Sequence, residues 1–246
     1  MGKFIAYFDY LGYKSFIENC EPDRLDTRIS HILRDIEMSM GNGKYIESSR
    51  GHLVADISSS IVHCLNISDT VIFSTKDDSK ESLIELLEVA KKFNFQSNFY
   101  NMPVRGAILY DEYEMLSSQS KNEAGSTYSV NMIYGKGLVK VHTKAECLNW
   151  AGAVIDDSVI SKIAETENVD TFLTPYAKKY PVPYKHEPYI LEEYALKLLA
   201  DGQNETSIEN MCRNIKDSFA RDNKPTESER VQTIIANTVA FVKSHN

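Results

Sequence analysis

The sequence has few cysteines and no long apolar run. Its four cysteines, Cys20, Cys64, Cys147 and Cys212, lie far apart, with no Cys-x-x-Cys pair and no histidine at metal-ligand spacing. Neither a zinc site nor a disulfide framework is therefore expected, and the cysteines are interpreted as reduced core thiols. No apolar stretch approaches the roughly 20 residues that a membrane-spanning helix requires.

Positive charge is also scarce. The chain has 27 lysines and arginines against 35 acidic residues, a net charge of −8 over 246 residues. An acidic surface disfavours non-specific binding to nucleic acid or to an anionic membrane, so neither is expected as a partner. The N-terminus lacks the basic region and apolar core of a secretory signal. We therefore expect a cytoplasmic globular protein.

The first 110 residues predict the order strand, helix, strand, strand, helix, strand. The predicted segments are a strand at 3–11, a helix at 25–40, a hairpin at 61–75, a helix at 83–93 and a strand at 103–110. This order is typical of the split βαβ, ferredoxin-like arrangement, an antiparallel sheet with helices on one face. The fold class predicted is therefore α+β.

The pattern is weaker after residue 110. Polar composition indicates surface loops at 44–57 and 117–127, followed by a helix at 137–148 and a strand at 151–156. Prolines then interrupt a tyrosine-rich stretch, and helices are predicted near 190–201, 206–221 and 227–244. The sequence thus predicts a sheet domain over 1–174 and a helical C-terminal extension over 175–246 packed on it.

Two aspartates stand out because of their positions. Asp9 lies in an apolar strand, where an ionised carboxylate must be paired, hydrogen-bonded or metal-bound. Asp69 lies at the tip of the predicted hairpin, and the first strand of a ferredoxin-like sheet runs beside such a hairpin. Neighbouring carboxylates repel unless a cation lies between them, and oxygen ligands favour Mg²⁺ or Mn²⁺. Alternatively, Asp9 caps the adjoining turn and Asp69 is a turn residue.

Four segments occur in the order and spacing of a known family. They are FDYLGYKSF at 8–16, ISDTVIF at 67–73, VRGAILY at 104–110 and YGKGLVKVHTKAE at 134–146. The ordered set resembles class III nucleotidyl cyclase domains, and more narrowly the stand-alone pyrimidine cyclases of bacterial Pycsar antiphage systems. This resemblance implies a class III cyclase sheet. It also implies conversion of UTP or CTP to a 3′,5′-cyclic monophosphate and pyrophosphate, as an antiphage second messenger.

The resemblance also implies a metal site. Asp9 and Asp69 match the two metal-binding aspartates, which hold two Mn²⁺ or Mg²⁺ ions per site. Tyr10 takes the position whose backbone carbonyl reaches the second metal. Arg105 matches the arginine of the family's Arg-Gly pattern, and its alternative is a sheet-surface arginine paired with an acid.

The triphosphate-binding segment is implied in the same way. The turn that matches it consists of Leu11, Gly12, Tyr13 and Lys14. Gly12 permits a close approach of the backbone, and Lys14 adds positive charge. Class III sites form between two chains arranged head to tail, so the resemblance further implies a homodimer. Its cyclic product would activate a separate effector.

The sequence departs from the family pattern at two places. Asp111 and Glu112 follow the Arg-Gly strand, where family members usually carry a glycine. Purine cyclases have Asn and Arg one helical turn apart in the segment that corresponds to 137–148, whereas this chain offers Lys140 and Lys144 as the catalytic candidates. Lysine neutralises phosphate charge but lacks the bidentate geometry of arginine. The departures fit a pyrimidine cyclase, with a catalytically degenerate nucleotide sensor or a purine cyclase as alternatives.

Overall fold

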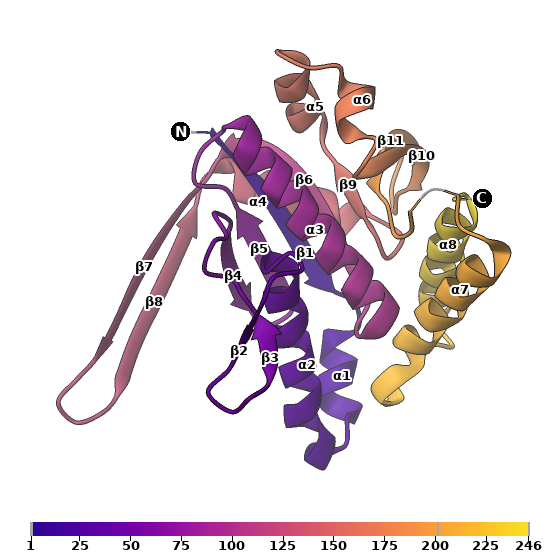
Figure 1. The fold of residues 1–246 in the computed structure, drawn as a ribbon. Helices are drawn as coiled ribbons and strands as arrows, with labels where there is room; N and C mark the ends of the chain where they lie inside the picture. Colours follow the sequence, from indigo (N-terminus) through magenta and orange to yellow (C-terminus); the bar gives the residue numbers. More distant parts are fainter. Residues whose placement is uncertain (1, 201, 246) are drawn as a thin grey trace.

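A seven-stranded sheet with the strand order β10-β11-β9-β6-β1-β5-β4 organises the molecule (Figure 1). The computed structural model describes residues 2–200 and 202–245. Among the neighbouring strands of this sheet, β6 and β9 pair in parallel and the others pair antiparallel. The strands are β1 (Gly2–Tyr10), β4 (His63–Ile67), β5 (Thr70–Ser74), β6 (Val104–Glu112), β9 (Ala153–Ile155), β10 (Ala177–Pro183) and β11 (Ile190–Leu196).

The centre of the sheet is closely packed where β1 pairs with β6. Gly106 faces Phe8 across this pair, and a Cβ atom at Gly106 would lie 2.5 Å from the Phe8 ring and 2.6 Å from the carbonyl oxygen of Tyr7. Only glycine fits there without a shift of the strands. The register that places Arg105 opposite Asp9 therefore depends on this glycine.

One face of the sheet is covered by helices α1 (Tyr13–Asn19), α2 (Pro22–Met40) and α3 (Lys80–Tyr100). In this core the rings of Phe8 and Phe73 both contact Phe93 of α3 edge to face, with centroids 5.0 and 5.3 Å apart. The Ser79 side chain caps α3 by accepting a hydrogen bond from the backbone N–H of Ser82. The predicted α+β class and its strand–helix order are confirmed.

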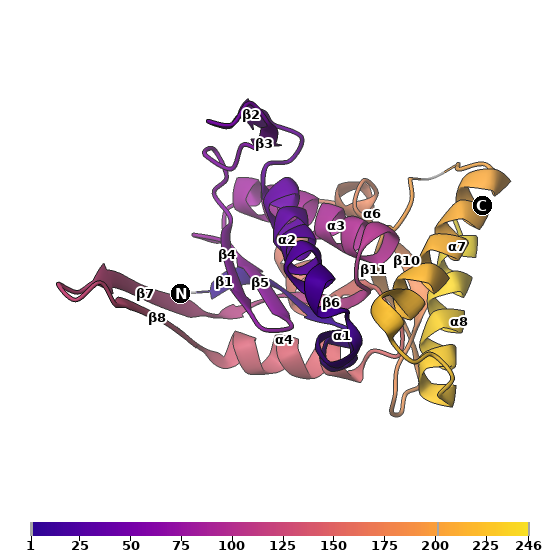
Figure 2. The ribbon, with the colours of Figure 1, turned by 90° about the horizontal axis from the view of Figure 1, so that it is seen from below.

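Helices also cover the second face of the sheet, which the prediction of helices on one face did not include. Figure 2 shows α4 (Lys136–Cys147) on the side opposite α2 and α3, with α7 (Glu205–Ala220) and α8 (Glu229–Lys243) at one end. Ile5 and Tyr7 of β1 point into this second core, whereas their neighbours point into the first. A strand that is apolar on both faces must be covered on both, so the continuous apolar run of β1 was a signal for two layers.

Two segments of the C-terminal third differ from the prediction. The helix expected near 190–201 is wrong, because Ile190–Leu196 forms β11, which joins the sheet beside β9 and β10. Short apolar runs do not distinguish helix from strand, and pairing with β10 decides the outcome here. The helices predicted at 206–221 and 227–244 are present as α7 and α8, linked by the short 3₁₀ helix η1 (Arg221–Asn223).

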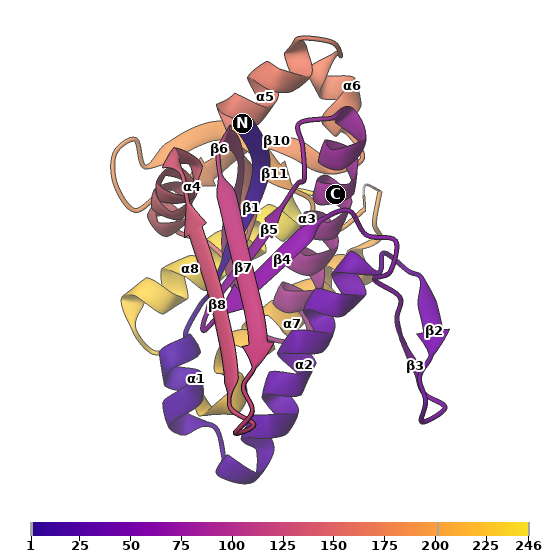
Figure 3. The same ribbon diagram turned by 90° about the vertical axis from the view of Figure 1, so that its left-hand side faces the viewer.

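Both predicted loops contain hairpins. The loop expected at 117–127 belongs to a two-stranded arm that projects from the body of the protein (Figures 1 and 2), and Figure 3 shows its two strands side by side. Its strands mix polar and apolar side chains, most of them exposed, so they lack the alternation of a strand with one buried face. The segment 44–57 carries a smaller hairpin. The remaining elements are β2 (Tyr45–Glu47), β3 (Leu53–Ala55), β7 (Glu114–Lys121), β8 (Thr127–Tyr134), α5 (Asp157–Ala164) and α6 (Val169–Leu173).

No helix in the described ranges 2–200 and 202–245 combines the length and apolarity needed to cross a membrane.

Candidate active site

Asp9 and Asp69 lie at the same edge of the sheet, where β1 ends beside the β4–β5 turn. Asp9 pairs in register with Thr70 of β5 and with Arg105 of β6. The next residue, Tyr10, donates its backbone N–H to the backbone carbonyl of Asp69 at 2.9 Å. The topology thus brings together two aspartates that are 60 positions apart.

The Asp9 carboxylate is held by Arg105. Nε and Nη2 of Arg105 donate to Oδ2 of Asp9 at 3.1 and 2.8 Å, and only 6% and 14% of the arginine and aspartate side chains are exposed. Burial raises the pKa of Asp9, the Arg105 charge lowers it in part, and the charges of Glu146 and Asp69 add to the increase. The catalytic and substrate-binding roles of Arg105 stay predictions. Arg105 is buried and is therefore not a sheet-surface arginine, but it does pair with an acid. That acid is Asp9 itself.

Two further charged residues complete this cluster. Glu146 of α4 accepts a hydrogen bond from Nη2 of Arg105, and its backbone carbonyl accepts bonds from Nη1 of Arg105 at 3.4 Å and from Nζ of Lys185. Lys185 lies between β10 and β11, where its backbone N–H is bonded to the Cys147 carbonyl at 2.8 Å. Burial lowers the pKa of Lys185, and the charges of Arg105 and Arg230 lower it further. The positive charges of two guanidinium groups therefore disfavour the protonated form of Lys185.

In the turn after β1, Gly12 and Lys14 are exposed, whereas Leu11 is buried and Tyr13 is partly buried. Gly12 has φ +79° and begins α1, in the left-handed conformation that favours glycine. Leu11 lies in the second core. The ring of Tyr13 packs against Tyr10 and Phe16, and 86% of the Lys14 side chain is exposed, with Glu18 at 3.7 Å. Gly12 is therefore the member of the predicted triphosphate turn whose backbone a ligand can approach closely.

A cavity of about 370 Å³ separates this turn from the C-terminal helices. Gly12 and Ser15 line one side, and Lys224 and Arg230 line the other. Lys224 packs its side chain over Gly12, since a Cβ atom at Gly12 would lie 3.3 Å from Cδ of Lys224. Its Nζ is buried without a hydrogen-bond partner among the described residues.

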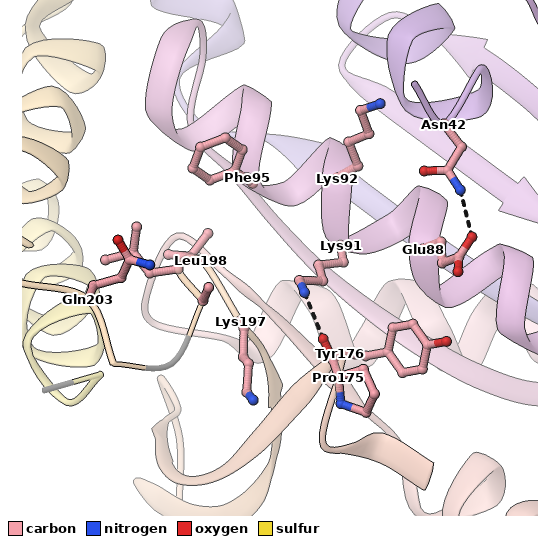
Figure 4. Close-up of a pocket in the computed structure, with 12 residues that line it drawn as sticks. Asn42, Glu88, Lys91, Lys92, Phe95, Pro175, Tyr176, Lys197, Leu198 and Gln203 are labelled. Atoms are coloured by element: carbon pink, nitrogen blue, oxygen red, sulfur yellow. Dashed lines mark hydrogen bonds between the residues drawn. The ribbon is translucent and has the colours of Figure 1, made fainter. Parts of the chain in front are cut away.

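Arg230 lines the cavity beside Gly12, and its charge also lowers the pKa of Lys185. A band of positive charge therefore runs from Asp9 toward Gly12 through Arg105, Lys185 and Arg230. The sequence alone did not identify Lys185, Arg230 or Lys224 as site residues. Glu146 was noted only as the last residue of the fourth motif. A second cavity, of about 620 Å³, opens between α3 and residues 197–203 and shares no lining residue with this site (Figure 4).

The two lysines predicted on α4 are engaged elsewhere. Nζ of Lys140 is bonded to Asp111 at 2.5 Å, and Nζ of Lys144 is bonded to Asp156 at 2.8 Å and to Glu193 at 2.6 Å. The chain does not bring these lysines to Asp9. Their catalytic role stays a prediction.

The aspartate edge fits a divalent cation of the Mg²⁺ or Mn²⁺ type. Both bonds from Arg105 go to one oxygen of Asp9, and the Asp69 carboxylate has no hydrogen bond or ion pair within residues 2–200 and 202–245. No group of three or more His, Cys, Asp or Glu side chains in this part of the chain could hold a metal ion. Carboxylate oxygens from the protein, completed by water and substrate phosphates, are the usual ligand set of Mg²⁺. The backbone carbonyl of Tyr10 as a further ligand stays a prediction.

Comparison with solved structures identifies the fold. The chain is similar to the catalytic core of a rhodopsin-guanylyl cyclase with converted specificity, in complex with ATPαS, with 7% identity, a TM-score of 0.50, and coverage of 80% of this chain and 95% of that one. It is also similar to the dimeric guanylyl cyclase domain of the RhoGC fusion protein from Blastocladiella emersonii, with 8% identity, a TM-score of 0.50, and coverage of 79% and 93%. No protein-family model and no curated protein matches the sequence. The fold is that of a class III nucleotidyl cyclase domain.

Replacement of Arg105 is expected to destabilise the protein strongly. Arg105→Met leaves the buried Asp9 carboxylate without its partner, and removing one member of a buried pair lowers the free energy of unfolding by about 3 kcal/mol. Lys140→Met is the matched control, because its ion pair with Asp111 is largely exposed on the lysine side and is screened by solvent. Urea denaturation of both variants measures the difference. Equal losses would contradict the role assigned to the Arg105–Asp9 pair.

Replacement of Lys224 is expected to stabilise the protein at neutral pH. Burial lowers the pKa of Lys224 to about 8, so the ammonium form is disfavoured in the folded state at pH 7. Lys224→Met removes this penalty and raises the free energy of unfolding by about 3 kcal/mol at pH 7. The wild type regains stability as the pH rises from 8 towards 10.5, because the unfolded state then binds more protons. Denaturation at pH 7 and pH 10 tests this, and an advantage that does not shrink with pH contradicts it.

Proposed function

We propose that the chain is a nucleotidyl cyclase that converts UTP or CTP to the 3′,5′-cyclic monophosphate and pyrophosphate. The observation that carries the proposal is the placement of Asp9 and Asp69 at one sheet edge, beside the Gly12 turn and the positive charges of Arg105, Lys185 and Arg230. The similar solved structures, both guanylyl cyclase domains, support the same chemistry.

The triphosphate has a binding surface on this edge. Gly12 allows phosphate oxygens to approach the backbone closely. Lys185 and Arg230 supply the positive charge that a polyphosphate requires, and Lys14 adds a mobile charge from the solvent side. Arg105 retains one oxygen of Asp9, which leaves the other oxygen for a cation.

Two Mg²⁺ or Mn²⁺ ions would be held by Asp9, Asp69 and the Tyr10 carbonyl. Bound there, they supply Lewis acidity to the ribose 3′-hydroxyl and neutralise charge on the leaving phosphate. In the reaction, the 3′-oxygen loses its proton and forms a bond to the α-phosphorus, and the bond from that phosphorus to the β-phosphate oxygen breaks. The chain's part is positional: Arg105 fixes the Asp9 carboxylate, and the Gly12 turn aligns the triphosphate for in-line displacement.

The pyrimidine substrate and the antiphage role are the finer parts of the proposal. They are supported by the motifs that resemble Pycsar cyclases, and by Lys140 and Lys144 in the segment where purine cyclases have Asn and Arg. The cyclic product would act on a separate effector.

The proposed active form is a head-to-tail homodimer. The β7–β8 arm exposes apolar side chains along its length, including Leu116 and Met132, each 59% exposed and paired in register. A second copy of the chain would cover them, and one similar solved structure is described as a non-canonical dimer. In such a dimer, Lys140 and Lys144 would serve the partner's triphosphate after exchange from their carboxylate partners.

One observation favours a second candidate, a nucleotide sensor without turnover. Arg105 already neutralises Asp9 through two hydrogen bonds, and this pairing competes with a metal for the carboxylate. A sensor of this kind would bind a nucleoside triphosphate and release it unchanged.

Turnover with separate triphosphates tests the proposed reaction. Incubation with ATP, GTP, CTP or UTP and Mn²⁺ is expected to give cyclic UMP or cyclic CMP by mass spectrometry. Asp9→Ala and Asp69→Ala are each expected to lower the rate by at least about 10³-fold, because the carboxylates that hold the cations are gone. Asp26→Ala, an exposed aspartate on α2, is the matched control and retains full activity.

A cyclic purine product would support nucleotidyl cyclase activity and contradict the proposed pyrimidine substrate. Binding without any product would support the sensor, and full activity in either Asp9→Ala or Asp69→Ala would reject the proposed site.

The dimer has its own test. Leu116→Glu combined with Met132→Glu places two charges on the apolar arm and is expected to convert the dimer to a monomer with at least about tenfold lower activity. Gln119→Glu adds a charge to the same strand without touching the apolar pair, and it retains the dimer. Light scattering coupled to size-exclusion chromatography measures the mass. A monomeric wild type, or a dimer that survives in the double variant, would contradict this interface.

A further inference from the structure

An arginine-rich groove lies on the face of the sheet opposite the Asp9 side chain. It has a volume of about 930 Å³ and runs between α2, the C-terminal end of α3 and η1. Four arginines line it: Arg24, Arg28, Arg34 and Arg221. Such a concentration of positive charge is notable in a chain whose net charge is −8.

Two of these arginines are fixed by the fold. Nε of Arg28 donates to both carboxylate oxygens of Asp222 at 3.0 and 3.1 Å, and this pair is buried. Nη1 of Arg221 donates to the Tyr100 carbonyl. These arginines form the rigid base of the groove, and their positions are set before any ligand binds.

The other two arginines are available to a ligand. Arg24 and Arg34 of α2 are exposed, and neither makes a hydrogen bond or an ion pair within residues 2–200 and 202–245. Asp35 is the one carboxylate among the described lining residues, and it is buried and accepts a hydrogen bond from Nδ2 of Asn101 at 2.9 Å. Positive charge in the groove therefore exceeds its local compensation.

His31 lies among the same positive charges. It lines the groove with Nδ1 3.5 Å from Nη1 of Arg28. Burial lowers the pKa of His31, and the charges of Arg34, Arg28 and Arg221 lower it further. A further positive charge is thus disfavoured in the groove, and a bound anion is favoured.

Aromatic rings stand beside the guanidinium groups. Tyr45 of β2 and Tyr100 of α3 line the groove with 48% and 59% of their surfaces exposed, and Phe95, also in the lining, contacts the Tyr100 ring edge to face with centroids 5.9 Å apart. Exposed rings offer stacking surfaces for a planar base, and guanidinium groups bind phosphate oxygens in pairs. The volume of the groove is in the range of small-molecule sites.

We propose that this groove is a second nucleotide site, which binds a nucleoside di- or triphosphate. Arg24 and Arg34 take the phosphates, and Tyr45 and Tyr100 take the base. The site is independent of the proposed cyclase reaction, since it shares no residue with the Asp9 edge. The segment 221–224 connects the two regions, because Asp222 is paired with Arg28 and Lys224 packs on Gly12.

Calorimetric titration in the presence of EDTA tests this site, because chelation removes the cations on which the Asp9 edge depends. ADP is expected to bind the wild type, and pyrophosphate to bind more weakly because it lacks a base. Arg24→Ala combined with Arg34→Ala is expected to weaken ADP binding about a hundred-fold, the loss of two charge-assisted contacts. Arg213→Ala, an exposed arginine of α7, is the matched control and leaves the affinity unchanged.

Lys185→Ala separates the two sites. It removes a charge from the cluster beside Asp9, so ADP binding that survives in Lys185→Ala supports the groove. Loss of binding in Lys185→Ala but not in the double arginine variant would overturn the proposal. So would equal affinity for pyrophosphate and ADP, tighter binding of a poly-glutamate peptide than of ADP, or no binding of ADP at 1 mM.

Discussion

Asp9 carries its charge in an inner strand of the sheet, and Arg105 on the neighbouring strand compensates that charge. The pair exists because Gly106 lets β6 lie close against β1, so that residues 9 and 105 face each other in register. Glu146 of α4 supplies a second negative charge to the arginine, and Lys185 from the β10–β11 connection is bonded to the backbone carbonyl of Glu146. The interaction thus fixes the position of a carboxylate and draws in three parts of the chain that are distant in sequence.

The C-terminal third is part of this arrangement. Strands β10 and β11 extend the sheet, and α7 and α8 cover the face on which Asp9 lies. Arg230 and Lys224 come from this region and border the Gly12 cavity. The edge of the sheet at Asp9 is therefore built from both ends of the chain, with β1 supplying the carboxylate and the C-terminal region supplying positive charge.

Local signals predicted the elements around Asp9, and long-range pairing decided the rest. An apolar run for β1, β-branched runs around a turn for the β4–β5 hairpin and helical spacing for α3 were sufficient, and the ferredoxin-like order then placed Asp69 beside β1. β11 was predicted as a helix because a short apolar run fits both periods until its partner strand is known. Lys185 and Arg230 were missed for a related reason: each is a single charged residue whose role depends on contacts that no local pattern contains.

Several charged groups around this edge have shifted pKa values. Burial raises the pKa of Asp9 and lowers the pKa of Lys185 and Lys224. By contrast, the hydrogen bond between Lys140 and Asp111 raises the pKa of the lysine and lowers the pKa of the aspartate, so it favours the charged form of both. A core selected for stability alone would replace a buried, unpartnered ammonium group such as that of Lys224 with an apolar side chain. Charges that are held at the expense of stability, in a cluster beside a left-handed glycine turn, are typical of a site at which chemistry or binding needs them. The charged residues around Asp9 therefore indicate a functional site without any likeness to known cyclases.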